Sequence, residues 1–343
     1  MSGRTSRATT LPRATLAGVP VPADSAAPVD AVAALWAASD SQRALVLQLL
    51  ARDSFGVSDL TDILAVPQPA LSHHLKILSD AGWVTTRKEG ANTFYRRAVI
   101  AANEPLAALR GAVFDALDQR AFDSRILHRV AIVHDQRQQR SAAFFARHAA
   151  AFRQHQDQII EPGAFIDSLQ QLLDAAGPPD RRLAIEHGPG TGELLLWLAG
   201  RFRRVIGIDA SAAMLAQARQ RVRAAALKNV RLVLGDTESL TEQPKADALF
   251  TSMVLHHLPS PATFFTAARA ALSPRGRLFL VELCPHQQDW TRECCGDLWL
   301  GFEPEELLVW AGAAGLQHLQ AQYLTQRNGF RIQLHVFQEN GTT

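Results

Sequence analysis

The chain has 343 residues, more than one ordinary domain needs, and this length predicts about two domains. Hydrophobic residues make up 47% and charged residues 20%, which excludes collagen-like, coiled-coil and wholly disordered proteins. The formal net charge is only +2, with the basic surplus in residues 1–150, so charge alone does not establish a polyanionic partner.

The chain has no run of about 18 uncharged apolar residues, and its first residues lack the apolar core of a signal peptide. Three cysteines, Cys284, Cys294 and Cys295, are too few for a disulfide framework. We therefore expect no membrane span, no signal peptide and a reducing, cytoplasmic location.

The sequence pattern divides the chain into four segments. Residues 1–28 are rich in Ala, Pro, Ser, Thr and Arg without apolar periodicity, so we expect a disordered arm. Residues 29–122 are mostly helical with one extended stretch, and 123–178 form a helical linker. In 179–343 short β-like runs alternate with helical runs, which predicts βα units and a parallel sheet.

Three helices are predicted in the first folded segment. One begins after the capping residue Asp40, a second begins at Val57, and a third covers Ala70–Leu78 and ends before Gly82. Apolar residues of the third helix recur at i, i+4 and i+7, the spacing of a single buried face. This buried stripe is formed by Leu71, Leu75 and Leu78.

A basic hairpin follows these helices. Two strands, Trp83–Thr86 and Thr93–Arg96, are joined by the turn Arg87–Asn92. The arrangement predicts a winged helix-turn-helix, in which a helix enters the major groove of DNA and basic side chains lie near phosphates. The alternative is a small helical domain with solvated polar faces. The expected DNA-contacting residues are Gln68, Ser72, His73, Lys76, Arg87 and Lys88.

The strings Pro-Ala-Leu-Ser-His-His-Leu-Lys-Ile-Leu at 69–78, Ala-Gly-Trp-Val at 81–84 and Arg-Lys-Glu-Gly at 87–90 resemble the ArsR/SmtB-type repressors. The resemblance implies a homodimer that pairs its first and last helices. Such a dimer binds a two-fold double-stranded operator with half-sites about one helical turn, ~34 Å, apart.

The sequence departs from the metal-sensing members of this family. Where those members carry Cys-Val-Cys-Asp-Leu, this chain has Gly-Val-Ser-Asp-Leu at 56–60, and residues 103–122 contain no histidine. Scattered histidines at 128, 134, 148 and 155 lack the spacing of a helical metal pair, so we expect them on a helix surface. We therefore expect no metal site.

The last segment opens with a strand, a glycine loop and a helix. The strand Arg182–Glu186 precedes Gly188, Gly190 and Gly192, and an apolar helical run follows. Two more strands, 204–209 and 230–236, also end in acids. This order is typical of nucleotide binding at the carboxyl ends of parallel strands, where acids accept hydrogen bonds from ribose and adenine.

The glycine spacing after an acid resembles the class I S-adenosylmethionine-dependent methyltransferases. The resemblance covers about 180–285, and β-like runs at 317–326 and 330–338 are compatible with the reversed hairpin of that family. The expected fold is thus an α+β winged helix-turn-helix domain followed by an α/β Rossmann-like methyltransferase domain. The resemblance assigns S-adenosylmethionine or S-adenosylhomocysteine to Glu186, Gly188, Gly190, Gly192, Asp209, Ala210, Met214, Asp236, Thr237 and Ser252.

His256 and His257 follow the fourth strand, where small-molecule methyltransferases of the ubiquinone- and arsenite-methylating kind face their acceptor. They are candidates for catalysis, and the alternative is that they only shape the loop. Arsenite ligation would need cysteine thiolates, and the adjacent Cys294-Cys295 pair is awkward for joint ligation, so structural thiols are the favoured interpretation. Trp290, Trp299 and Trp310 are expected in the core rather than in an acceptor pocket.

Two functions are consistent with this order of domains. The first is a DNA-binding regulator whose methyltransferase-like domain binds the adenosyl ligand as its effector. The second is a working methyltransferase whose N-terminal domain serves autoregulation or dimerisation, and a metalloid-linked enzyme is a weaker third. An acceptor pocket filled by side chains would favour sensing, whereas an open pocket beside His256 and His257 would favour catalysis.

Overall fold

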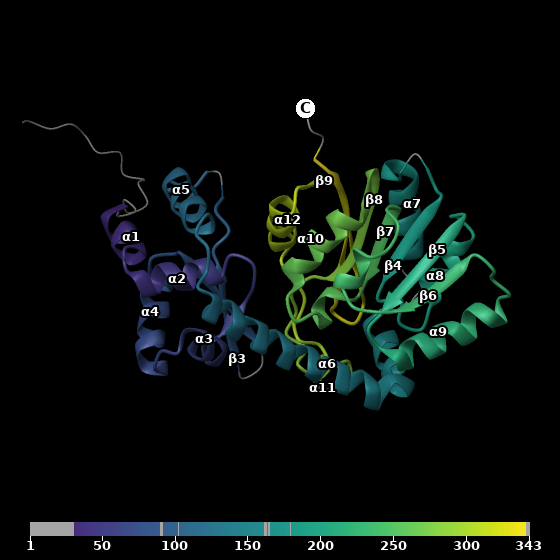
Figure 1. Ribbon diagram of the computed structural model, residues 1–343, viewed down its shortest axis with the longest axis horizontal. Coiled ribbons are helices and arrows are strands. Elements are labelled where there is room, and N and C mark those ends of the chain that lie inside the picture. Colours follow the sequence, from purple (N-terminus) through teal and green to yellow (C-terminus); the bar gives the residue numbers. More distant parts are fainter. Residues whose placement is uncertain are drawn as a thin grey trace, which may run out of the picture.

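The computed structural model describes residues 31–340, except 90, 91, 102, 161, 162, 164 and 179. The arm expected at 1–28 lies outside the described residues. Two lobes are joined by one long helix that runs beneath both of them (Figure 1). In the described part of the chain no helix has the length and apolarity to cross a membrane.

The N-terminal lobe contains the three expected helices and two more. Asp40 accepts hydrogen bonds from the backbone N–H groups of Gln42 and Arg43, and so caps the helix that follows. The apolar stripe predicted for the third of these helices, Leu71, Leu75 and Leu78, is buried in the core of this lobe. This third helix is the one expected to enter the major groove, and we call it the recognition helix. The helices are α1 (Ala31–Ala38), α2 (Ser41–Leu49), α3 (Val57–Leu64), α4 (Gln68–Asp80) and α5 (Ala107–Asp118).

The hairpin pairs antiparallel, but its strands are longer than predicted. A small sheet in the order β1-β3-β2 contains β1 (Phe55–Gly56), β2 (Val84–Glu89) and β3 (Asn92–Arg97). Arg87 and Lys88 therefore lie in β2 and not in the turn, where they were expected. The edge position of β2 explains this, because edge strands commonly carry charged side chains.

The linking segment is dominated by α6 (Ser124–Ile159), whose 36 residues span ~54 Å. It is followed by α7 (Ile166–Ala176), which packs on β9 and β10 at the far edge of the large sheet. Both agree with the predicted helical character of 123–178.

The C-terminal lobe is a seven-stranded sheet in the order β6-β5-β4-β7-β8-β10-β9, with helices on both faces (Figure 1). The first five strands are parallel, and β10 pairs antiparallel with both β8 and β9, as the reversed hairpin predicts. The strands are β4 (Leu183–His187), β5 (Arg204–Asp209), β6 (Val230–Leu234), β7 (Ala246–Ser252), β8 (Leu272–Leu283), β9 (Leu316–Thr325) and β10 (Arg331–Glu339).

The crossover segments place loops at the carboxyl ends of the parallel strands. They are α8 (Glu193–Ala199), α9 (Ala212–Ala224), the 3-10 turns η1 (Glu238–Leu240) and η2 (Leu255–His257), and α10 (Pro261–Ala271), with α11 (Trp290–Cys294) and α12 (Pro304–Ala313) after β8. The third strand ends at Leu234, earlier than predicted, because the Asp236 carboxylate accepts from the backbone N–H groups of Glu238 and Ser239 and turns the chain. The expected fold class is confirmed.

A buried arginine on α6 bridges the two lobes. The Arg137 guanidinium donates to the Ser54 carbonyl at 3.1 Å and the Asp59 carboxylate at 2.8 Å in the N-terminal lobe. It donates to the Pro259 carbonyl at 3.0 Å in the other lobe, and it lies over the Trp299 ring at 4.9 Å. One side chain thus satisfies buried acceptors of both lobes.

The wing also contacts the C-terminal lobe. The Arg87 Nη1 donates to the Gly301 carbonyl at 2.7 Å, and Arg96 forms an ion pair with the buried Glu306. The Phe94 ring meets the Trp299 ring edge-on, with centroids 5.3 Å apart. The hairpin therefore packs against the segment between α11 and α12.

Replacing Arg137 by alanine is expected to lower the free energy of unfolding by about 3–5 kcal/mol, because the Asp59 carboxylate and two carbonyls lose their buried donor. Urea denaturation followed by tryptophan fluorescence measures the change. Arg125→Ala is the matched control on the same helix, where an exposed pair with Asp123 should leave the midpoint unchanged. Equal midpoints for Arg137→Ala and the unchanged protein would contradict the bridging role.

Candidate functional site

A cavity of about 1160 Å³ opens at the carboxyl ends of β4, β5, β6 and β7. Nine of the ten residues expected to hold the adenosyl ligand line it, although they come from four separate strand ends and the segments that follow them. They are Glu186, Gly188, Gly190, Asp209, Ala210, Met214, Asp236, Thr237 and Ser252. The topology thus brings together what the sequence spreads over 67 positions.

The tenth residue, Gly192, lies outside the described lining. It begins α8 with a φ of +86°, and a Cβ there would lie 3.1 Å from Ala218. Gly192 therefore serves the close packing of α8 on α9. Gly188 and Gly190 also have positive φ, and a Cβ on Gly188 would lie 2.4 Å from the Val254 side chain.

Two buried acids form the polar end of the cavity. Burial and the nearby charge of Asp209 raise the pKa of Glu186 to about 8, and its Oε2 finds no hydrogen-bond partner among the described residues. Burial raises the pKa of Asp209 to about 6, although N–H groups of Ser211 and Gly190 stabilise its carboxylate at 2.8 and 3.1 Å. A ligand that brings a cation or hydroxyl donors would satisfy both acids.

The third acid has a structural role as well. Asp236 turns the chain after β6, and it also lines the cavity. Its neighbour Thr237 shares a hydrogen bond with the imidazole of His187, with Oγ1 and Nε2 3.2 Å apart. Burial lowers the pKa of His187 to about 4, so this ring is neutral at physiological pH.

One wall of the cavity comes from α6, which the sequence did not indicate. His134, Asp135, Gln138 and Phe145 line the cavity from this helix. His134 was expected on a helix surface, yet its Nε2 lies 3.3 Å from the Asp53 carboxylate of the N-terminal lobe. No local pattern reveals this, because the wall exists only once α6 packs across the sheet.

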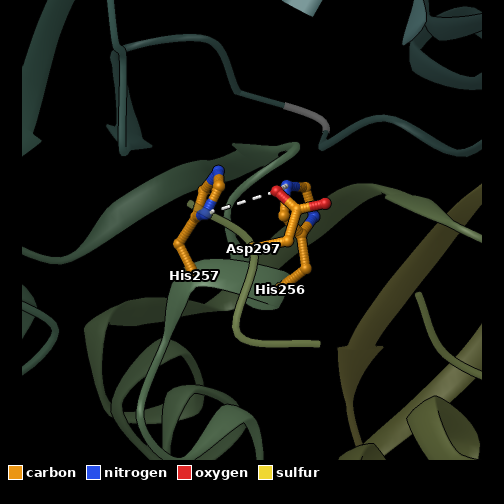
Figure 2. A group of neighbouring side chains, drawn as sticks. All are labelled: His256, His257 and Asp297. Atoms are coloured by element: carbon orange, nitrogen blue, oxygen red, sulfur yellow. Dashed lines mark ion pairs between the residues drawn. The ribbon is translucent and has the colours of Figure 1, made fainter. Parts of the chain in front are cut away.

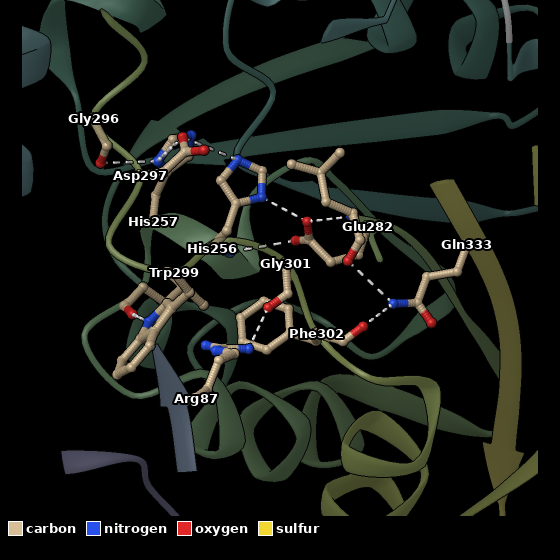
Figure 3. A network of polar contacts seen from close by, with 12 residues as sticks. Arg87, His256, His257, Glu282, Gly296, Asp297, Trp299, Gly301, Phe302 and Gln333 are labelled. Carbon is tan, nitrogen blue, oxygen red and sulfur yellow. Dashed lines mark hydrogen bonds and ion pairs between the residues drawn. The ribbon is translucent and has the colours of Figure 1, made fainter. Parts of the chain in front are cut away.

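The adjacent histidines have different environments (Figure 3). His257 lines the cavity, whereas His256 donates from Nδ1 to the Glu282 carboxylate at 2.6 Å. Burial lowers the pKa of His256, but the charges of Glu282 and Asp297 outweigh it and raise this pKa to about 9. Burial and the charge of His256 hold the pKa of His257 well below its ordinary value. His257 is thus the neutral, cavity-facing member of the pair.

Two of the three cysteines, Cys284 and Cys295, are buried in surroundings that disfavour a thiolate. Burial raises the pKa of Cys284 to about 11 and also raises the pKa of Cys295. Because metalloid ligation requires deprotonated thiols, this disfavours the metalloid interpretation. The residues Trp290, Trp299 and Trp310 lie outside the described lining of the cavity.

The expected DNA-contacting residues fall into two groups. Gln68, Ser72, His73 and Lys76 are all exposed on α4, opposite the buried stripe, and Lys88 is exposed on β2. Arg87, in contrast, is half-buried against Gly301 and lies 3.9 Å from the Glu306 carboxylate. In this arrangement the exposed face of α4 is accessible to DNA and Arg87 is engaged by the other lobe.

Two family models match separate parts of the chain. Residues 40–86 match the bacterial regulatory protein, arsR family, and residues 185–280 match a methyltransferase domain. The arsenical resistance operon repressor of Staphylococcus aureus is 43% identical over 58 residues, 17% of this chain and 56% of that protein. A trans-aconitate 2-methyltransferase of Methylobacterium nodulans is 33% identical over 130 residues, 38% of this chain and 47% of that protein.

An uncharacterised 37.1 kDa protein from transposon TN4556 of Streptomyces fradiae is 37% identical over 130 residues, 37% of each chain. The matches span less than two thirds of the length of these curated relatives. Among solved structures, the N-methyltransferase NodS from Bradyrhizobium japonicum WM9, in complex with S-adenosyl-L-homocysteine, aligns at 16% identity. Its TM-score is 0.45, covering 59% of this chain and 99% of that one.

The raised pKa of Glu186 predicts a pH-dependent affinity for S-adenosylhomocysteine, the ligand that the sequence resemblance implies. Below pH 8 the carboxyl group is protonated, and a ligand ammonium group favours its ionised form, so binding releases a proton. Affinity should therefore rise between pH 6 and pH 7.5, by up to about tenfold per unit. Calorimetry at several pH values measures this.

Two controls isolate the carboxyl group. 5′-Methylthioadenosine lacks the amino-acid moiety and should bind with little dependence on pH. The Glu186→Gln variant should lose the dependence for S-adenosylhomocysteine while keeping its fold. If this variant retained the pH profile of the unchanged protein, Glu186 would not be the titrating group.

Proposed function

We propose that this chain, which joins an arsR-type helix-turn-helix domain to a class I methyltransferase domain, is a cytoplasmic transcriptional regulator that senses an adenosyl ligand. It binds a double-stranded DNA operator as a homodimer through α4 and the wing. S-Adenosylmethionine or S-adenosylhomocysteine in the cavity is its effector. The observation that carries the proposal is the contact between the wing and the lobe that contains the cavity.

A short path of contacts connects the cavity to the wing. His257 lines the cavity, and the carbonyl of the preceding His256 accepts from the backbone N–H groups of Leu298 and Trp299. Two residues after Trp299, the Gly301 carbonyl accepts from Arg87 of the wing. A ligand that moves η2 therefore moves the segment on which the wing rests.

The helix α6 supplies a second connection. Its residues line the cavity, and farther toward its N-terminus Arg129 donates to the Ile63 carbonyl at 3.0 Å, at the end of α3. Because α3 packs against α4, a shift of α6 reaches the recognition helix. Coupling of about 1–3 kcal/mol between two such sites gives roughly 5–150-fold control of DNA affinity.

The docked wing sets the direction of this coupling. The Arg87 donor that reaches Gly301 and the Arg96 charge paired with Glu306 are not at the same time available to DNA phosphates. The docked arrangement thus has the lower affinity for DNA, and a ligand that stabilises it releases the operator. A ligand that loosens it has the opposite effect.

The proposed homodimer is supported by α1. Trp36 and Leu35 on this helix are 60% and 44% exposed, which is unusual for large apolar side chains gathered on one short helix. Pairing of first helices is what the ArsR/SmtB resemblance implies, and it would bury this face. The two recognition helices would then address both half-sites of a two-fold operator.

A working methyltransferase is the second candidate, and the size of the cavity favours it. Small-molecule sites usually measure about 300–1,000 Å³, and this cavity reaches about 1160 Å³. The surplus volume leaves room for a methyl acceptor beside His257. Formation of S-adenosylhomocysteine from S-adenosylmethionine that depends on an added acceptor would support this function.

The regulator is tested by DNA titration on the intergenic region next to its own gene, with each adenosyl ligand added in turn. Asp209→Ala should weaken ligand binding about tenfold or more, because a carboxylate that accepts ligand hydroxyls is lost, and it should abolish the ligand effect on DNA. Asp180→Ala, an exposed acid of the same lobe, is the control. DNA affinity that neither ligand changes would contradict the sensing function.

Releasing the wing should raise DNA affinity without any ligand. Glu306→Gln removes the charge that pairs with Arg96 but retains an oxygen able to accept from the Glu303 N–H at the start of α12. We expect about fivefold tighter operator binding and a smaller ligand effect. Lys76→Ala should instead weaken binding and lower its salt slope by about one. If Glu306→Gln bound DNA as the unchanged protein does, the wing contact would not regulate binding.

A further inference from the structure

Three possible metal ligands meet in the interior beside the cavity (Figure 2). The Nε2 of His256 and the Nδ1 of His257 each lie 3.8 Å from Oδ1 of Asp297. The same Nδ1 lies 3.3 Å from the Gly296 carbonyl, a hydrogen bond that metal binding would replace. One ligand atom from each residue lies within 4.8 Å of the others, and all three side chains are buried. Two atoms held ~2.0–2.2 Å from a shared ion are up to ~4.4 Å apart, so this spacing is close to that of a metal site.

The Asp297 carboxylate has the two histidines at 3.8 Å as ion-pair partners but no hydrogen-bond donor among the described residues. Its side chain is 0% exposed, and neither carboxylate oxygen accepts a hydrogen bond from the described residues. The neighbouring Thr291 hydroxyl affects the charge state of this carboxylate but donates to the Gln288 carbonyl at 3.2 Å. A buried carboxylate without donors is costly, and a bound cation removes that cost.

Glu282 orients His256 in the manner of a metal ligand (Figure 3). His256 donates from Nδ1 to Glu282, so in the neutral ring, the form that binds a metal, the lone pair is on Nε2, the nitrogen that faces Asp297. Metal-binding histidines usually donate their other N–H to a carboxylate in this way, which fixes the tautomer. The backbone N–H groups of His256 and Leu283 hold Glu282 in place at 3.3 and 2.6 Å.

The charges of the cluster call for two positive charges. Glu282 and Asp297 are two buried carboxylates that lie against the two ring nitrogens of His256. The charge of Arg292 acts to lower the pKa of Asp297, against the effect of burial. A divalent ion bound to neutral imidazoles would balance the charge of both carboxylates.

We propose that His256, His257 and Asp297 bind one divalent transition-metal ion, with zinc as the reference ion. Two imidazoles and one carboxylate are a ligand set that suits zinc and ferrous iron, and Glu282 supports His256 from behind. The sequence analysis, which predicted no metal site, did not indicate this cluster, since Asp297 lies 40 residues beyond His257 and no spacing motif relates them.

The ion would bind beside the cavity, where the proposed contacts from the ligand to the wing begin. Asp297 precedes the segment Leu298–Phe302, whose Gly301 carbonyl holds the wing, while His257 lines the cavity. Metal binding would fasten this segment to η2. Three protein ligands leave a further coordination position for water or a small ligand.

The full-length protein, dialysed first against a chelator and then against zinc, tests the site by elemental analysis and calorimetry. We expect one zinc per chain, at least tenfold weaker binding in Asp297→Asn, and 10–100-fold weaker binding in Glu282→Gln. His318→Gln is the matched control, because His318 and His335 form another close histidine pair, 3.1 Å apart, on β9 and β10. This control should retain the zinc.

Cobalt(II) provides a readout that does not depend on the folding of any variant. Bound to the unchanged protein, it should give the visible absorption of a low-coordinate site without the thiolate charge-transfer band that cysteine ligands produce. Less than stoichiometric zinc, a thiolate band, or full zinc binding by a folded Asp297→Asn variant would each overturn the proposal. The DNA and adenosyl titrations described above are separate readouts, so the two proposals can fail independently.

Discussion

The guanidinium of Arg137 is the contact on which the arrangement of the two lobes depends. It is buried, it donates to acceptors on both sides, and it lies between the rings of Phe55 and Trp299. Only arginine offers enough donors in a fixed plane to satisfy two carbonyls and a carboxylate at once. This bond pattern holds α6 against both lobes, so the helix can serve as a wall of the cavity and as a support for the recognition helix.

The cavity and the cluster beside it concentrate buried acids. Glu186, Asp209, Glu282 and Asp297 are placed in or next to one hollow, and burial makes their ionised forms costly. Backbone N–H groups stabilise Asp209 and Glu282, whereas Glu186 and Asp297 have oxygens without described partners. Buried polar groups without hydrogen-bond partners are a usual sign of a binding site. Glu186 suits the ammonium group of a small-molecule ligand, whereas Asp297 suits a metal ion.

The sequence predicted those parts of the molecule that local chemistry determines. The stripe of Leu71, Leu75 and Leu78 and the acid Asp209 at the end of β5 follow from periodicity and strand order, and they are where they were expected. Asp236 lies two residues beyond the end of β6. At Gly192 the sequence could not separate packing on α9 from ligand approach, because both require the same residue type. The engagement of Arg87 and the approach of Asp297 to the histidines depend on contacts across more than 35 positions, for which one sequence contains no signal.

The uninterrupted length of α6 has a mechanical consequence. A rod of ~54 Å that tilts by ~5° at one end moves its other end by ~5 Å. In the proposed dimer, the two α4 helices must match half-sites ~34 Å apart. A displacement of ~5 Å in each protomer is enough to move both α4 helices out of register with the major groove. Small adjustments in the cavity that α6 lines would thus be amplified by leverage, with no hinge needed inside either lobe.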